Sequence, residues 1–176
     1  MLARKKTLSL LLGLAANCAL SGAHAGETSF ELNYYEDSPG GAEIAAHDYA
    51  EAISAAKAWT AGDPTTALIS STNLCVAYTK TGSFKEASKA CDAAVALARG
   101  FDASAPGIAS DSPSSRALSN RGVLRALRGD TAGALSDLRA AGKGTGSSQA
   151  PVRNLAYLVS SPAYRERVVL ADSATD

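Results

Sequence analysis

Two alanine-rich runs on either side of a single glycine make up the stretch NLCVAYTKTGSFKEASKACDAAVALAR, Asn73 to Arg99. Apolar residues in both runs recur at or near steps of three and four, the spacing that brings them to one face of a helix. Gly82 suits the left-handed residue that ends a helix. Ser83 and Glu86 then form a capping box that starts a second helix. The stretch therefore predicts a hairpin of two antiparallel helices.

The same hairpin recurs further along the chain. A shift of 47 residues carries Asn73 to Asn120 and Gly82 to Gly129. The shift also superimposes three further pairs, namely Val76 and Val123, Ala87 and Ala134, and Ala94 and Ala141. Proline opens each hairpin, in Asp63-Pro64 and in Ser112-Pro113, because it loses no hydrogen bond at the first helical position.

Half-hairpins flank the two full ones. A backward shift of 35 residues places the second helix of the first hairpin on Tyr49, Ala52 and Ala56. A forward shift of 34 residues from Asn120 reaches Asn154. A period of about 34 residues, with small residues facing each other across a helical hairpin, resembles the tetratricopeptide repeat (TPR).

This resemblance implies an all-α fold over residues 45–159, a short TPR-like α-solenoid of antiparallel helical hairpins in a right-handed superhelix. Where two such helices nearly touch, only small residues fit between the backbones. The residues expected there are Cys75, Ala87, Ala94, Gly122, Ala134 and Ala141. The chain departs from the repeat at Arg125, in place of a tyrosine, at Thr131, in place of an aromatic residue, and in 13 inserted residues within 100–112.

The N-terminus has the pattern of a cleaved secretory signal peptide over residues 1–25. Basic residues precede an apolar stretch, and Ala23-His24-Ala25 supplies the small residues that a signal peptidase reads. The apolar stretch is too short for a helix that spans a membrane. We therefore expect an exported, most simply periplasmic, protein that begins at Gly26. The alternatives are an extracellular protein and a lipoprotein anchored through Cys18.

The segments outside the repeats are harder to interpret. Residues 26–44 include SFELNYY, which alternates like a strand, but the sequence offers no second strand to pair with it. An extended tail or an added first helix is expected there instead. Residues 142–148 are expected to be a flexible connection. Residues 160–176 are expected to form a capping helix, which begins at Pro162, and a tail.

Charge argues against nucleic acid as a partner. Without Arg4, Lys5 and Lys6, the 17 basic residues fall to 14 against 17 acidic ones, a net charge of −3. Such a chain has no electrostatic reason to bind nucleic acid or an anionic membrane. No stretch after the signal is long and apolar enough to span a membrane, so no integral membrane segment is expected.

Candidate catalytic, cofactor and metal sites are not evident. His47 is the one histidine after the signal, and a metal site usually needs three or four ligands. The sequence GKGTGSS lacks the residues of a phosphate-binding loop and follows a helix, so it is interpreted as a linker. We expect no enzyme, no cofactor and no bound metal.

Cys75 and Cys91 are the only cysteines after the signal. They lie 16 residues apart, about equally far from the turn, and so nearly level across the hairpin. Exported proteins form disulfides readily when two such cysteines come close. A disulfide between the two helices is predicted. Two buried free thiols remain the alternative, since cysteine also packs as a small apolar residue.

Asparagine occurs at matching places in the first helices, as Asn73, Asn120 and Asn154. In a TPR protein these helices line the concave groove, so the resemblance implies a peptide-binding groove. Its candidate residues are Asn73, Val76, Arg116, Asn120, Val123 and Asn154. The full set of groove residues that grips a C-terminal carboxylate in some TPR domains is absent. The alternative is that each asparagine bonds the neighbouring helix and holds the stack in register.

The sequence thus predicts a non-enzymatic interaction module that binds a peptide or a partner helix of unknown identity in its groove. The alternatives are a structural subunit of an envelope assembly and a redox or enzymatic protein. Fold-level resemblance identifies only this class of function.

Overall fold

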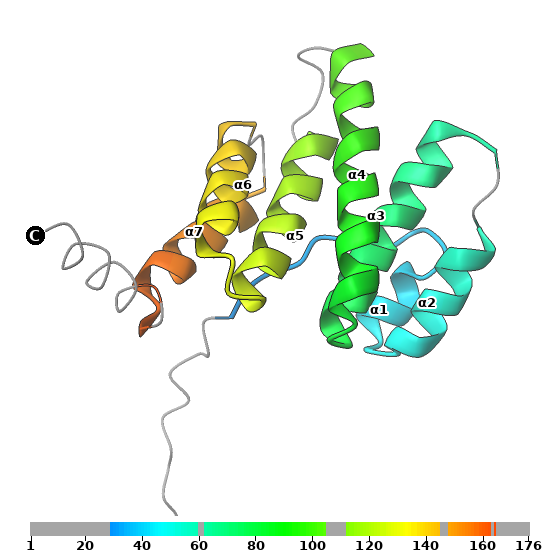
Figure 1. Ribbon diagram of the computed structural model, residues 1–176. Helices are drawn as coiled ribbons and strands as arrows, with labels where there is room; N and C mark the ends of the chain where they lie inside the picture. Colours follow the sequence, from blue (N-terminus) through cyan, green and yellow to red (C-terminus); the bar gives the residue numbers. More distant parts are fainter. Residues whose placement is uncertain (1–28, 60–61, 105–111, 145–147, 163, 165–176) are drawn as a thin grey trace, which may run out of the picture.

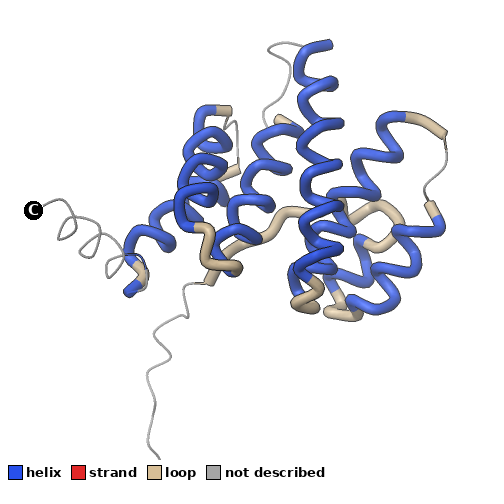
Figure 2. The backbone as a smooth tube through the Cα atoms, viewed as in Figure 1, coloured by secondary structure: helices blue, strands red, loops and turns tan. Residues whose placement is uncertain are grey.

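The computed structural model describes residues 29–59, 62–104, 112–144, 148–162 and 164 (Figure 1). The predicted signal peptide with Cys18 lies outside the described residues, as does the chain beyond Tyr164, where most of the predicted capping helix falls. The described part of the chain holds seven helices and no strand (Figure 2). The prediction of an all-α fold is confirmed.

The helices follow one another with short connections. Two of them are brief, α1 (Gly41–Ala45) and α2 (Tyr49–Ala58). The others are α3 (Pro64–Lys80), α4 (Phe84–Ser104), α5 (Pro113–Leu127), α6 (Thr131–Lys143) and α7 (Ala150–Ser160). Hairpins α3–α4 and α5–α6 are the two full hairpins that the sequence predicts.

Local signals set the ends of these helices. The Asp63 carboxylate accepts the N–H groups of Thr65 and Thr66, which satisfies donors at the start of α3 that have no partner in the helix. The Ser112 hydroxyl accepts the N–H of Ser115 in the same way at α5. Gly82 and Gly129 follow α3 and α5 with φ of 71° and 80°, a conformation that other residues adopt only with strain.

The helices form two rows. Each helix packs on the next, and α5 also contacts both α3 and α7. Helices α3, α5 and α7 therefore lie side by side in one row, and α4 and α6 form the second row beside it (Figure 1). We call the surface of α3, α5 and α7 that carries Asn73, Asn120 and Asn154 the inner face, and these three residues the asparagine row.

Small residues sit at the contacts between helices. Ala87, Ala94, Ala134 and Ala141 are at most 1 % exposed. A Cβ added at Gly122 would come within 2.8 Å of Cγ of Leu138, closer than packed carbon atoms approach. Backbone proximity of α5 and α6 thus depends on the absence of a side chain at Gly122.

Some predicted boundaries differ from the structure. Helix α1 begins at Gly41, within residues 26–44, the segment predicted as an extended tail or an added first helix. Helix α4 continues through Gly100 to Ser104, so the first inserted residues lengthen this helix. Helix α6 continues to Lys143, with Gly144 as its cap, and so extends into the segment predicted as a connection from residue 142.

The disulfide predicted between α3 and α4 is present. Cys75 and Cys91 are joined, with their Cα atoms 4.7 Å apart. Both residues are at most 1 % exposed and pack with Ala87 and with Leu124 of the next hairpin. The bond therefore ties together the two helices at the centre of the described fold.

Candidate functional site

An extended segment, residues 29–35, lies against the inner face. We call this segment the N-terminal arm. It crosses the row of helices from α7 toward α3 and then turns through residues 36–40 into α1 (Figures 1 and 2). Its direction is therefore opposite to the order of the helices in the chain.

The asparagine row holds the arm by its backbone. The side-chain oxygen of Asn154 accepts the N–H of Glu31 at 2.7 Å, and its NH₂ group donates to the Glu31 carbonyl at 2.8 Å. Asn120 makes the same pair of bonds with Asn33, at 2.8 and 2.6 Å. Asn73 makes them with Tyr35, at 2.9 and 3.1 Å.

This arrangement matches the geometry of an extended chain. Every second residue of such a chain turns its N–H and C=O to the same side, and one asparagine amide can pair with both groups. Residues 31, 33 and 35 meet three asparagines from three successive inner helices. These contacts fix the register of the arm, but they do not select its side chains because they involve only its backbone.

The intervening residues of the arm pack into two apolar clusters. Leu32 and Tyr34 pack against Ile44 and Val76, and both of these helix residues are at most 4 % exposed. Phe30 packs against the cluster that contains Leu158, and its ring meets that of Tyr157 edge-on at 4.7 Å between centroids. Apolar burial therefore adds to the backbone bonds at alternate positions.

Two arginines also contact the arm. Arg116 donates from Nη1 to the Tyr34 carbonyl at 3.1 Å, and its guanidinium lies 4.2 Å from the centre of the Tyr35 ring. Arg153 forms a bidentate ion pair with Glu31, in which two N–H groups meet two carboxylate oxygens. These hydrogen bonds lower the pKa of Glu31 and raise that of Arg153.

The turn after the arm is held by the same row. The NH₂ group of Asn73 lies 3.0 Å from the Ser38 hydroxyl and 3.3 Å from the Pro39 carbonyl. The backbone passes so close to Gly41 that a Cβ there would overlap the carbonyl oxygens of Tyr35 and Glu36. The arm thus enters α1 through a tightly packed turn.

The structure places the predicted groove residues as follows. Asn73, Asn120 and Asn154 are completely buried, and Arg116 and Val76 also touch the arm. Val123 is buried with no exposed surface. One contact supports the alternative role of the asparagines, which is to hold neighbouring helices in register. The NH₂ group of Asn154 donates to the Ser119 hydroxyl of α5 at 3.2 Å.

The sequence does not predict the arm as the occupant of the inner face. Its stretch SFELNYY alternates like a strand, but the sequence offers no second strand to pair with it. The hydrogen-bond partners of this extended segment are asparagine side chains rather than another strand. The alternation was the signal that could have found it.

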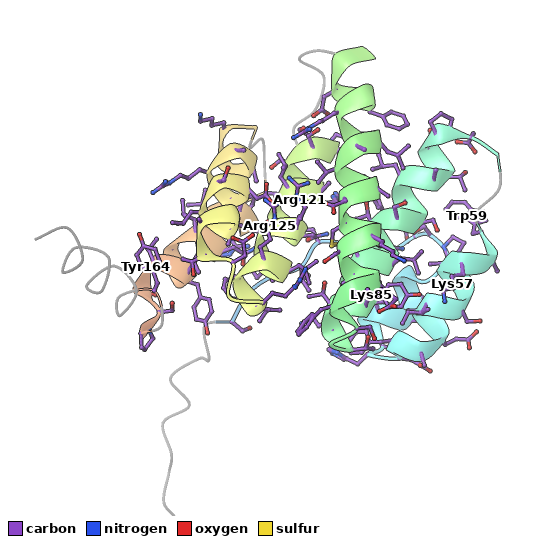
Figure 3. The ribbon with its side chains drawn as sticks, in the orientation of Figure 1. Lys57, Trp59, Lys85, Arg121, Arg125 and Tyr164 are labelled. Atoms are coloured by element: carbon purple, nitrogen blue, oxygen red, sulfur yellow. A yellow bond between two sulfur atoms is a disulfide. The ribbon has the colours of Figure 1, made fainter. Side chains whose placement is uncertain are left out.

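A cluster of charged residues lies between α4, α5 and α6 (Figure 3). Arg121 makes a bidentate bond with the buried Asp137 at 2.8 Å and also pairs with Asp92. Arg125, which stands where the first hairpin has Tyr78, pairs with Asp137 and Asp130. The hydrogen bond to Asp137 raises the pKa of Arg121.

This charged cluster lines a hollow of about 300 Å³. The sequence did not draw attention to it, although Arg121 and Asp137 lie 16 residues apart, the same spacing as Cys75 and Cys91. Carboxylates neutralise Arg121 and Arg125, so these two residues link adjacent helices. Arg128, which also lines the hollow, donates to the Ser88 hydroxyl at 2.7 Å.

Candidate metal and catalytic groups do not gather among the described residues. No group of three or more His, Cys, Asp or Glu side chains is placed to hold a metal ion there. His47 lies in the junction between α1 and α2 with φ of 61°, and its Nδ1 lies 2.8 Å from the Tyr49 hydroxyl. None of the described helices is long and apolar enough to cross a membrane.

Comparison of the chain with protein-family models, curated proteins and solved structures finds no match. The geometry of the inner face is therefore the basis for a functional proposal.

Proposed function

We propose that this protein is an exported, TPR-like interaction module that binds an extended polypeptide segment along its inner face. The observation that carries the proposal is the pairing of the asparagine row with the arm. Three buried amides, one from each successive inner helix, each pair with both backbone groups of one residue in an extended chain. Such a surface recognises a polypeptide in one conformation and one register.

The TPR-like interpretation adds the right-handed superhelix and the concave groove. It is supported by the repeat of 47 residues between the hairpins and by the small residues buried at matching positions. It accounts for the position of the asparagine row, because the first helices of successive hairpins line the groove in that repeat. Arg125 has a physical reason to depart from the repeat, since its partner Asp137 is buried beside it.

A role in thiol–disulfide exchange is disfavoured by the burial of the disulfide. Thiol exchange requires a thiolate to reach a disulfide sulfur, and Cys75 and Cys91 are at most 1 % exposed. We assign the bond a structural role. We assign no catalytic residue and no cofactor.

Photocrosslinking tests the proposed function. A benzophenone amino acid is placed at Lys80, which is exposed and lines a hollow of about 310 Å³ beside the arm. A matched variant carries it at Ser136, an exposed residue of α6, which is not one of the helices that form the inner face. The expected result in envelope extract is a crosslink from Lys80 to one short segment of a partner, with none from Ser136.

Mass spectrometry of the crosslinked peptide identifies that segment. Equal labelling from both positions, or labelling from Ser136 alone, would place the interaction elsewhere and refute binding along the inner face. Light scattering on the purified protein separates a lone binder from a subunit of a larger homo-oligomer.

A further inference from the structure

The arm has the contacts of a bound peptide rather than of a core element. Its backbone is paired with side chains of α3, α5 and α7, and in the described part of the chain it is connected to the helices through residues 36–40 alone. All its residues are half-buried or exposed, whereas the asparagine row beneath it has no exposed surface. Removal of the arm from the inner face breaks no helix.

The centre of the arm fits its site imperfectly. The side-chain NH₂ group of Asn33 is buried and has no hydrogen-bond partner among the described residues. A buried donor without a partner opposes binding, since the same group is hydrated when the arm is released. A smaller side chain at this place keeps both backbone bonds to Asn120 and avoids the unpaired donor.

The surroundings of the arm define what a replacement strand must carry. Phe30 occupies an aromatic site beside Tyr157, and Glu31 meets Arg153. Leu32 occupies an aliphatic site beside Val76. Tyr35, two residues after Asn33, lies against the Arg116 guanidinium, so a replacement strand needs an aromatic ring at that position.

We propose that the N-terminal arm is a resident occupant that gives way to a partner strand of the same pattern. In order, that strand carries an aromatic, an acidic, an aliphatic and a small residue, followed by two aromatic residues. This inference rests on the proposed function and names its ligand class. The partner runs opposite to the order of the helices, as the arm does.

Competition between arm and partner has a measurable consequence. A partner binds only the fraction of molecules in which the arm is released, so its apparent affinity falls by that fraction. A change that loosens the arm without altering the helices therefore tightens the binding of a separate peptide. A change that holds the arm more tightly weakens the binding of the separate peptide.

The binding of a fluorescent peptide to the chain from Gly26 to Asp176 tests this competition. The peptide is SFELAYYE, residues 29–36 with alanine in place of Asn33, and its binding is followed by anisotropy. Leu32→Ala in the protein loosens the arm, and we expect the apparent affinity for the peptide to rise by about tenfold. Asn33→Ala in the protein removes the unpaired donor and should lower the affinity.

Charge reversal tests the register. A peptide with lysine in place of Glu31 should bind the unmodified protein more weakly, because the lysine faces Arg153. The Arg153→Glu protein should reverse this preference and bind the lysine peptide more tightly than the original. Glu31→Lys in the protein is a second way to loosen the arm, for use if Leu32→Ala does not keep its helical circular dichroism.

Three results would overturn the inference. They are an affinity that does not change with the arm variants, no peptide binding to any variant, and a dimer of the loosened protein that the peptide cannot dissociate. The last would assign the inner face to the arm of a second copy. A partner crosslinked at Lys80 in any of these cases would lie beside the arm in the hollow that Lys80 lines. That result leaves binding along the inner face standing and removes only the exchange of the arm.

Discussion

The two full hairpins have the same design and are fastened differently. Hairpin α3–α4 has a disulfide where its helices meet, between Cys75 and Cys91. At the equivalent places hairpin α5–α6 has Gly122 and Leu138, in direct contact, and one residue earlier it has the pair of Arg121 and Asp137. One hairpin is closed by a covalent bond and the other by close packing and charge.

The difference shows how a repeat tolerates change. Both hairpins need a small residue where the backbones approach, and both cysteine and glycine meet this requirement. The further interaction that holds the two helices together can vary. A disulfide restricts the unfolded chain, whereas an ion pair acts within the folded state. The four predictions that follow compare the hairpins, from the largest expected effect to the smallest.

Reduction of the disulfide should have the largest effect. The bond closes a loop between residues 16 apart in the sequence. A loop of this length is worth roughly 3 kcal/mol of stability in the chain-entropy model. We expect the melting temperature to fall by about 5 °C or more on reduction, with the helical spectrum retained below it.

Thiol titration of the denatured, unreduced protein provides the control. It should detect no free thiol from Cys75 or Cys91. Two thiols in material from an oxidising compartment would contradict the bond, and both cysteines would then act only as small packing residues.

Transfer of the disulfide to the second hairpin sharpens the comparison. Gly122→Cys with Leu138→Cys places thiols at the positions equivalent to Cys75 and Cys91. The oxidised variant should be more stable than its own reduced form by about 2 kcal/mol, less than the native bond because engineered bridges strain their surroundings. Urea unfolding with and without reductant measures this difference. Failure of the new thiols to pair would show that the hairpins differ in backbone geometry.

Removal of the buried charge should affect only the second hairpin. Asp137→Asn leaves Arg121 and Arg125 without their shared partner, although each keeps a second carboxylate, Asp92 or Asp130. We expect a loss of about 1–2 kcal/mol, below the usual cost of breaking a buried ion pair because of these remaining partners. Asp92→Asn is the matched control, since Asp92 is largely exposed and its loss should be near neutral.

Acid should distinguish the starts of the two hairpins, with the smallest effect. Asp63 caps α3, and its hydrogen bonds, chiefly that from the Thr66 hydroxyl, lower the pKa of this carboxyl from its ordinary value of 3.8. Because the folded pKa is the lower one, this stabilisation is present above pH 3.8 and is lost as pH falls through the folded value. Ser112, which caps α5, does not titrate.

Hydrogen exchange measures this difference. The amides of Thr65 and Thr66 should lose protection as the pH falls below 3.8, after correction for intrinsic rates, while that of Ser115 should not. Asp63→Asn keeps an acceptor that does not titrate and should remove the pH dependence. Equal loss of protection at both helices would indicate global unfolding instead.

The sequence predicted those features that depend on neighbouring residues. Apolar spacing and the signals at Asp63-Pro64, Gly82 and Ser112-Pro113 predicted the helices, because helix ends are set by bonds within a few residues. The disulfide was predictable from the equal distances of Cys75 and Cys91 from one turn. The matching asparagines were visible as a repeat.

What fills the inner face was decided only in three dimensions. The bonds that hold the arm join residues 38, 87 and 123 positions apart, so no local pattern reports them. Alternation in SFELNYY predicts an extended chain, but such a chain needs partners for its backbone groups, and here those partners are side chains of three separate helices. The packing of these helices brings Asn73, Asn120 and Asn154 to the spacing of alternate residues in the arm, and that spacing exists only in the folded molecule.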